Sequence, residues 1–230
     1  MTRLAQDRDT HLTPQEIAQE VLRQFDAGAT NEPSIRRLAA ALKVAPSAIY
    51  HHYPSRAAIV DAACQLVWAE VAAEMQALVP DPFTADPVDV LVAAGLATRR
   101  GWTRHHRVAQ YMAATPRSNA FLAATVGLVA SLMERLGLDG EDAAAAFHTY
   151  ATFTLGSVMF VAARMAANEQ LDEQPSQRFR TEHGPRAAKR SSEQTRAALD
   201  DVMDLSSVDP ARDEALYVAG LRRVVETFAA

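Results

Sequence analysis

The chain has 230 residues, of which 49% are hydrophobic, and it carries a formal net charge of −5. That length allows a buried core and one or two domains, and the acidic balance excludes a protein that binds nucleic acid over its whole surface. The single cysteine, Cys64, excludes an internal disulfide. We expect a cytoplasmic protein without a signal peptide or a transmembrane helix.

The first predicted helix begins at Thr13 and ends near Gly28. Thr13 and Glu16 have the spacing of a capping box, and Pro14 occupies the first helical position, where its missing N–H is tolerated. An apolar stripe at helical spacing follows, so this helix has one buried face. The stripe consists of Ala18, Val21, Leu22 and Phe25.

Residues 34–56 predict two short helices joined by a tight turn. Ser34 is a good N-cap for the first, whose apolar face is Ile35, Leu38, Ala39 and Leu42. Residues 43–45 are too few for anything but a turn, and Pro46 opens the second helix. Its residues Ile49 and Tyr53 can face inward, which leaves hydroxyl and imidazole groups outside. This shape and chemistry are typical of a helix that reads the major groove of DNA. The outward residues are Ser47, Tyr50 and His51, with His52 toward one edge.

The run LAAALKVAPSAIYHHYPSRAAIVDA, together with the amphipathic helix before it, resembles the DNA-binding domain of the TetR family of transcriptional regulators. Further along the chain, residues 153–158 and 115–117 are similar to segments of the tetracycline-repressor type of ligand-binding domain. The resemblance implies an all-α protein with a helix-turn-helix head, residues 1–56. It also implies an α-helical effector-binding and dimerisation body, residues 57–230.

The sequence of the body predicts helices throughout. A long fourth helix starting near Arg56 has an apolar stripe from Ile59 to Met75 and links head to body, and the prolines from Pro80 onward end it. Residues 168–192 are polar and carry both charges, which is typical of a linker or of a functional lid. The further helices are expected at 88–103, 104–114, 119–136, 139–168, 193–203 and 210–228.

The resemblance implies which residues contact double-stranded DNA. Residues 1–56 hold seven basic and six acidic residues, so the head is close to neutral and would contact DNA over one small face. Phosphate contacts position a recognition helix, whereas contacts to base edges specify the sequence. Arg36 matches a position that can reach either a base or a phosphate. Lys43, in the turn, could add a phosphate contact. The residues implied at base edges are Pro46, Ser47, Ala48, Tyr50 and His51, and those implied at phosphates are Ser34, Tyr50, His52 and Arg56.

Two helices are candidates for a homodimer interface, those over residues 142–168 and 210–228. The first carries a stripe of small residues that permits close helix approach, and a two-fold dimer suits a palindromic operator. The alternative is that both stripes are buried within one subunit. The stripe consists of Ala151, Thr154, Val158 and Ala162.

Bulky side chains between the fourth helix and the dimerisation helices are either ordinary core or the lining of a small-molecule effector site. Ala72 and Met112 stand where tetracycline and its metal are held by histidines in the family, so we expect a hydrophobic or aromatic effector instead. The predicted effector residues are Trp68, Trp102, His105, Tyr111, Met112, Phe121, Phe147 and Tyr150.

No metal site, cofactor or catalytic constellation is expected. The adjacent pairs His51–His52 and His105–His106 point in different directions on a helix and do not chelate as units. The sequence has no glycine-rich phosphate loop, nucleophile elbow or HExxH pattern. The sequence therefore favours a ligand-released repressor. The alternatives are a helical enzyme or carrier with a vestigial head, and a DNA-binding regulator without an effector.

Overall fold

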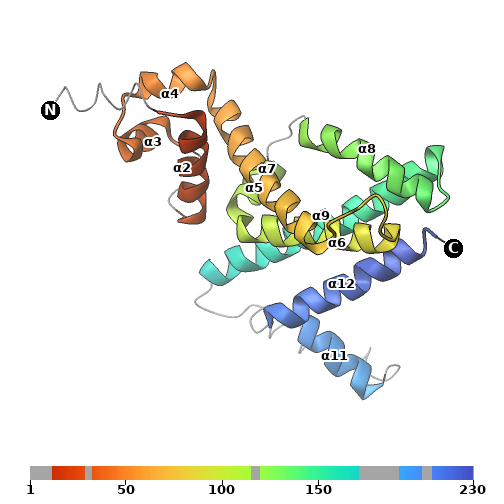
Figure 1. Cartoon of the computed structure of the whole chain (residues 1–230). Coiled ribbons are helices and arrows are strands. Elements are labelled where there is room, and N and C mark those ends of the chain that lie inside the picture. The colour runs from red at the N-terminus through yellow and green to blue at the C-terminus, as the bar shows by residue number, and fades with distance from the viewer. Residues whose placement is uncertain (1–11, 29–32, 115–119, 171–191, 204–208, 230) are drawn as a thin grey trace.

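The computed structural model describes residues 12–28, 33–114, 120–170, 192–203 and 209–229, and the regular elements of those residues are all helices. Figure 1 shows a small head formed by three helices, a long helix leading away from it, and a larger helical body. The helices are α2 (Pro14–Asp26), α3 (Ile35–Leu42), α4 (Pro46–His52), α5 (Arg56–Leu78), α6 (Pro87–Arg104), α7 (His106–Ala114), α8 (Ala120–Arg135), α9 (Gly140–Gln170), α11 (Glu193–Met203) and α12 (Pro210–Glu226).

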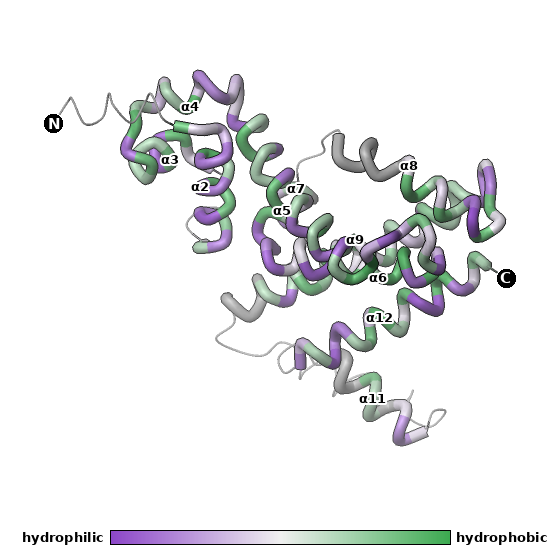
Figure 2. Tube along the Cα trace, viewed as in Figure 1, coloured by the Kyte–Doolittle hydropathy of each residue, from purple (hydrophilic) through white to green (hydrophobic). Residues whose placement is uncertain are grey.

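The head begins where the sequence predicts it. The Glu16 backbone N–H donates to the Thr13 hydroxyl at 3.2 Å, and the Thr13 backbone N–H donates to the Glu16 carboxylate at 2.8 Å, which completes the capping box. Alternating hydrophobic and hydrophilic segments along α2 and α5 are visible in Figure 2. Ile17 and Phe25 of α2 are fully buried, so this helix supplies much of the core of the head.

Helix α5 connects the head to the body through one continuous hydrophobic cluster. Its first turns bury Ile59 and Val60 against the head, and its later turns bury Trp68 and Val71 against the body. The same cluster includes Val158 of α9. A second cluster lies among α6, α8, α9 and α12.

Helix α6 lies close to two neighbours at its glycines. A Cβ added to Gly101 would lie 2.5 Å from Cγ2 of Val71 on α5, and one added to Gly95 would lie 2.4 Å from Cδ2 of Leu221 on α12. Both distances are shorter than a van der Waals contact, so these helices approach as closely as they do because the side chain is missing.

The small-residue stripe of α9 faces the subunit's own interior. Thr154, Val158 and Ala162 are buried, and the Tyr217 hydroxyl on α12 is 3.2 Å from the Thr154 hydroxyl. The prediction that this stripe meets a second subunit is therefore wrong, since intrasubunit packing on α6, α7 and α12 already covers it.

Helix α9 also contains a long apolar stretch. Residues 143–163 contain no Asp, Glu, Lys or Arg, and Gly140–Met165 is long and apolar enough to cross a membrane by length and composition. From the sequence we expect no helix that could cross a membrane, and by length and composition that expectation is wrong. Only 22% of the apolar window is buried within the subunit, so α9 presents an unusually apolar exposed surface.

Most predicted helix boundaries agree with the structure to within two residues. The linker predicted at residues 168–192 begins later, because α9 continues to Gln170. Residues 171–191 lie outside the described part of the chain.

We predict that Gly95→Ala destabilises the protein, although alanine is the better helix former. Leu221 is fully buried, so moving its side chain away from the added Cβ disturbs the packing around it, which costs about 1–3 kcal/mol, against a gain in helix propensity of about 1 kcal/mol. The measurement is the urea midpoint at fixed protein concentration. Gly127 of α8, around which an added Cβ meets nothing within 4 Å, is the matched control.

Gly127→Ala should raise the midpoint. A Gly95→Ala midpoint at or above that of the unmodified chain would show that the close approach of α6 and α12 imposes no constraint.

Candidate nucleic-acid interface and effector region

Helices α3 and α4 are held by a few apolar side chains and by the turn between them. Leu38 and Ile49 are buried in the head. Lys43 ends α3 in the left-handed conformation, with φ at 59°, and its backbone N–H donates to the carbonyl of Ala40. This conformation reverses the chain within three residues and sets α4 at its angle to α3. Ser34 is at the N-cap of α3 as predicted, but its hydroxyl makes no capping hydrogen bond.

The predicted DNA-contacting residues lie in and beside α3, in α4 and at the start of α5. Tyr50 is 51% exposed although it is aromatic. Ser34, Ala48 and His52 are half-buried, with His52 at the edge as expected. The remaining predicted residues are exposed, and these are Arg36, Lys43, Pro46, Ser47, His51 and Arg56.

Tyr53 fixes the C-terminal end of α4. Its hydroxyl donates to the backbone carbonyl of Pro14 at 3.0 Å, which ties the end of α4 to the first turn of α2. Partial burial raises the pKa of the Tyr53 hydroxyl above its usual value, so it stays protonated and able to donate. Ser55 then caps α5 by accepting from the Ala58 backbone N–H at 3.1 Å, and this places Arg56 in the first turn of α5.

His105 occupies the junction between head and body. Its Nδ1 is 3.0 Å from a carboxylate oxygen of Asp26, the last residue of α2, and its Nε2 is 3.2 Å from Glu70 of α5. The sequence places His105 in the effector site, but the structure gives it a bridging position between three helices. Beside it, the rings of Phe25 and Tyr111 pack at 5.5 Å between centroids.

The predicted effector residues divide between two clusters. Trp68 and Trp102 meet edge to face at 5.3 Å, and Tyr111 and Met112 pack against the same cluster. Tyr150 and Phe147 belong to the second cluster, and the Tyr150 hydroxyl donates to the Leu91 carbonyl at 2.9 Å. The structure therefore does not gather these residues around one site. The side chain of Phe121 lies outside the described residues.

Two buried polar atoms near the carboxyl-terminal end of α6 have no hydrogen-bond partner among the described residues. They are the indole Nε1 of Trp102 and the hydroxyl of Thr103. Buried donors of this kind are ordinarily paired, because an unpaired donor loses its hydration without replacement. The carboxyl-terminal end of α6 is therefore a place where a ligand or water could supply acceptors.

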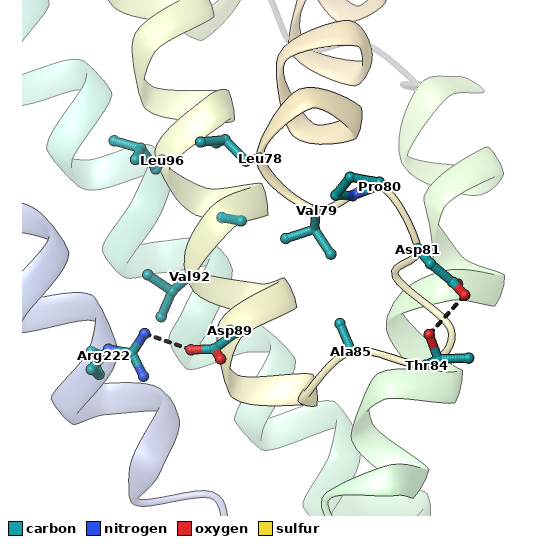
Figure 3. Close-up of a pocket in the computed structure, with 11 residues that line it drawn as sticks. Leu78, Val79, Pro80, Asp81, Thr84, Ala85, Asp89, Val92, Leu96 and Arg222 are labelled. Carbon is teal, nitrogen blue, oxygen red and sulfur yellow. Dashed lines mark hydrogen bonds and ion pairs between the residues drawn. The ribbon is translucent and has the colours of Figure 1, made fainter.

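A pocket of about 710 Å³ lies at the carboxyl-terminal end of α5. Figure 3 shows Val79, Val92 and Leu96 around it, with the Arg222–Asp89 ion pair at one side. The two charged groups of that pair are 2.6 Å apart. None of the predicted effector residues lines this pocket. Among the described residues, no group of three His, Cys, Asp or Glu side chains is placed to hold a metal ion.

Comparison with protein families matches two consecutive parts of the chain. The model described as "Bacterial regulatory proteins, tetR family" matches residues 22–63, which include the whole of α3 and α4. The model described as "Tetracyclin repressor-like, C-terminal domain" matches residues 79–226. The chain belongs to the TetR family. It is therefore a helix-turn-helix transcriptional regulator and not an enzyme.

Solved structures of TetR-family proteins share the fold. The regulator SCO7222 from Streptomyces coelicolor is 21% identical, with 95% of this chain and 98% of that chain covered and a TM-score of 0.67. ActR from the same organism, in complex with actinorhodin, is 22% identical, with 94% and 95% covered and a TM-score of 0.65. A single-residue variant of TetR from Acinetobacter baumannii AYE, in complex with minocycline, is 17% identical, with 94% and 96% covered and a TM-score of 0.61. Sequence comparison with curated proteins gives no match.

We predict that Tyr53→Phe lowers both stability and DNA affinity of this TetR-family protein. Loss of the hydrogen bond to Pro14 removes about 1 kcal/mol and frees the end of α4, which must then be ordered on binding. Urea unfolding and DNA titration measure the two effects. Tyr50→Phe is the control for removal of a tyrosine hydroxyl, and because Tyr50 is exposed it should leave the urea midpoint unchanged. Equal midpoints for Tyr53→Phe and the unmodified chain would contradict the anchoring role.

Proposed function

We propose that the chain is a homodimeric repressor that binds a palindromic operator and is released by a small hydrophobic or aromatic effector. The observation that carries this proposal is the surface of α4, where Tyr50 and His51 are exposed while Ile49 and Tyr53 hold the helix on the head. The matched family is bacterial, and a bacterial chromosome lies in the cytoplasm, so the proposed place of action is the cytoplasm.

In this proposal α4 enters the major groove. Ser47, Tyr50 and His51 supply hydroxyl and imidazole groups that can donate to or accept from base edges, and Pro46 and Ala48 offer apolar contacts. Ser34, His52 and Arg56 hold phosphates together with the Tyr50 hydroxyl, and Arg36 and Lys43 extend the positive surface. Residues 1–56 form the DNA-binding part, and residues 57–230 form the regulatory and dimerisation part.

The exposed faces of α9 and α12 support the dimer. Leu155 and Phe160 of α9 are 45% and 49% exposed, and Leu216 of α12 is 46% exposed. The two helices already pack together within the subunit, with Phe153 stacked on Tyr217, so their exposed apolar faces are neighbours. Two such pairs brought together by a two-fold axis form a four-helix bundle, which removes the apolar surface of α9 from water.

The effector is proposed to bind near Trp68 and Trp102. The unpartnered Trp102 Nε1 supplies a donor there, and the surrounding aromatic side chains supply an apolar lining. ActR is seen with actinorhodin and TetR with minocycline, both in the same fold. Phe147 and Tyr150, which pack in the second cluster, line the proposed site only if a cavity opens between the two clusters.

The His105 junction supports a route from effector to operator. An effector that parts Trp102 from Trp68 moves the end of α6, and His105 there contacts Asp26 of α2 and Glu70 of α5. A changed spacing of the two heads then lowers operator affinity. A tenfold to hundredfold change requires about 1.4–2.8 kcal/mol of coupling, which one ligand can supply.

We predict that selection from a random DNA pool with the purified chain enriches a palindrome with half-sites one helical turn or a multiple apart. His51→Ala and Tyr50→Ala should each weaken binding to it by about 1–3 kcal/mol, because each removes a base contact. Titration of the selected duplex measures the loss. Arg56→Ala serves as the phosphate comparison and should weaken all sequences about equally, with the salt dependence reduced by about one ion.

Absence of enrichment would contradict DNA binding by this surface. Enrichment of a palindrome that both alanine variants bind as tightly as the unmodified chain would contradict the role given to α4.

We predict that Phe160→Glu dissociates the dimer, because it buries an unpaired carboxylate in an apolar interface. Sedimentation equilibrium measures the molecular mass. Phe83→Glu is the matched control, since Phe83 is 69% exposed in the segment between α5 and α6, and it should leave the mass unchanged. A monomeric unmodified chain, or a dimeric Phe160→Glu variant, would contradict the proposed interface.

A further inference from the structure

A pocket of about 440 Å³ lies where the carboxyl-terminal half of α6 meets α9 and the start of α12. It differs from the tryptophan region in its chemistry, because four arginines reach its wall and none of the aromatic effector residues does. Val161 and Met165 of α9 give it an apolar side. The volume is enough for a small organic molecule.

The arginines of this pocket are not balanced evenly by carboxylates. Arg100 and Arg104 share three, since Arg100 pairs with Glu214 and Glu74, and Arg104 pairs with Glu74 and Glu70. The Arg100 guanidinium lowers the pKa of the Glu214 carboxyl, with a smaller contribution from the charge of Arg99, and Arg100 donates hydrogen bonds to that carboxylate.

Arg99 and Arg164, by contrast, share one carboxylate. Asp213 accepts a hydrogen bond from Arg99, and it also lies 3.4 Å from Nη1 of Arg164. The side chains of Arg99 and Arg164 are only 7% and 12% exposed. Buried charges in proteins are ordinarily neutralised by partners, because the surrounding medium screens them poorly. Among the described residues, this end of the pocket therefore holds two nearly buried cations against one anion that pairs with both.

The other groups at this end of the pocket differ in charge. The Ser157 hydroxyl accepts from Arg99 Nε at 2.8 Å and so holds that guanidinium in place. Thr103 lines the pocket, and its hydroxyl is buried without a hydrogen-bond partner among the described residues, so it can donate to a ligand. The first turn of α12 reaches the pocket through Pro210 and Asp213, and Asp209 caps that turn by accepting from the Ala211 backbone N–H at 3.0 Å, so the preference for an anion comes from the arginines and not from the end of the helix.

We propose that this pocket binds a small organic carboxylate, with its negative group between Arg99 and Arg164 and its apolar part against Val161 and Met165. A guanidinium donates two parallel hydrogen bonds to a carboxylate, and Arg164 has this capacity largely unused. Its other contact is the Phe160 ring, 5.6 Å from the guanidinium carbon. The bound acid would tie α9 and α12 to the segment of α6 that ends at His105. The site is thus separate from the tryptophan region.

The test uses sodium benzoate as the probe and the full-length protein, with chloride added to keep the ionic strength constant. Benzyl alcohol is the neutral ligand of similar shape. We expect saturable binding of benzoate by calorimetry, a higher melting temperature, and no response to benzyl alcohol. Arg164→Gln should weaken benzoate binding about tenfold or more, since a charge-assisted bidentate contact is lost. Arg223→Gln, on an exposed part of the same helix as Asp213, is the charge-matched control and should bind as the unmodified chain does.

Asp213→Asn separates a binding site from a purely structural ion-pair network. In a binding site the variant loses the internal competitor, so it should bind benzoate more tightly and recover its lost melting temperature when benzoate is added. In a purely structural ion-pair network, benzoate should not raise the melting temperature of Asp213→Asn. No saturable binding, an equal response to benzyl alcohol, unchanged binding by Arg164→Gln, or no recovery of Asp213→Asn would each overturn the proposal. Operator titration of Arg164→Gln without benzoate reports on DNA binding separately.

Discussion

The close packing of α6 is the constraint on which the rest of the structure depends. This helix contacts α5, α7, α8, α9 and α12, and it approaches α5 and α12 at two glycines that leave no room for a side chain. Because packed helices have few alternative arrangements, a shift of α6 must be taken up by its neighbours. A movement of α6 is therefore passed on to the helices that it contacts.

The functional groups of the body are distributed along this one helix. Trp102 faces Trp68 of α5, His105 reaches the head through Asp26, and Arg99 points to α9 and α12. Each of these contacts joins α6 to a different neighbour. If ligands bind on both sides of α6 as proposed, they act on the same element, and reciprocity then requires that DNA binding by the head alter ligand affinity in turn.

The head is rigid for a comparable reason. Its three helices are short, and α4 has only seven residues, too few for a helix to be stable alone in water. Ile49 inside the core and the Tyr53 hydroxyl on Pro14 supply the missing support. The outer face of α4 is consequently left without a packing role, and it carries an exposed tyrosine and two histidines.

The sequence alone determined the local features of this protein. The capping box at Thr13, the proline at the start of α4 and the proline break after α5 act within a few residues, so the helices and the exposed face of α4 could be predicted. The helix-turn-helix surface follows directly, because inward and outward positions on a two-turn helix are set by its periodicity.

Only the tertiary structure decided which faces meet. A stripe of small residues such as Thr154 and Val158 suits packing within a subunit as well as between subunits, and a pattern cannot distinguish the two. The separation of Trp102 from Tyr150 and the bridging role of His105 depend on contacts far apart in the chain. The same is true of the carboxylate shared by Arg99 and Arg164, because Asp213 lies on another helix and nothing in the local sequence pairs it with them.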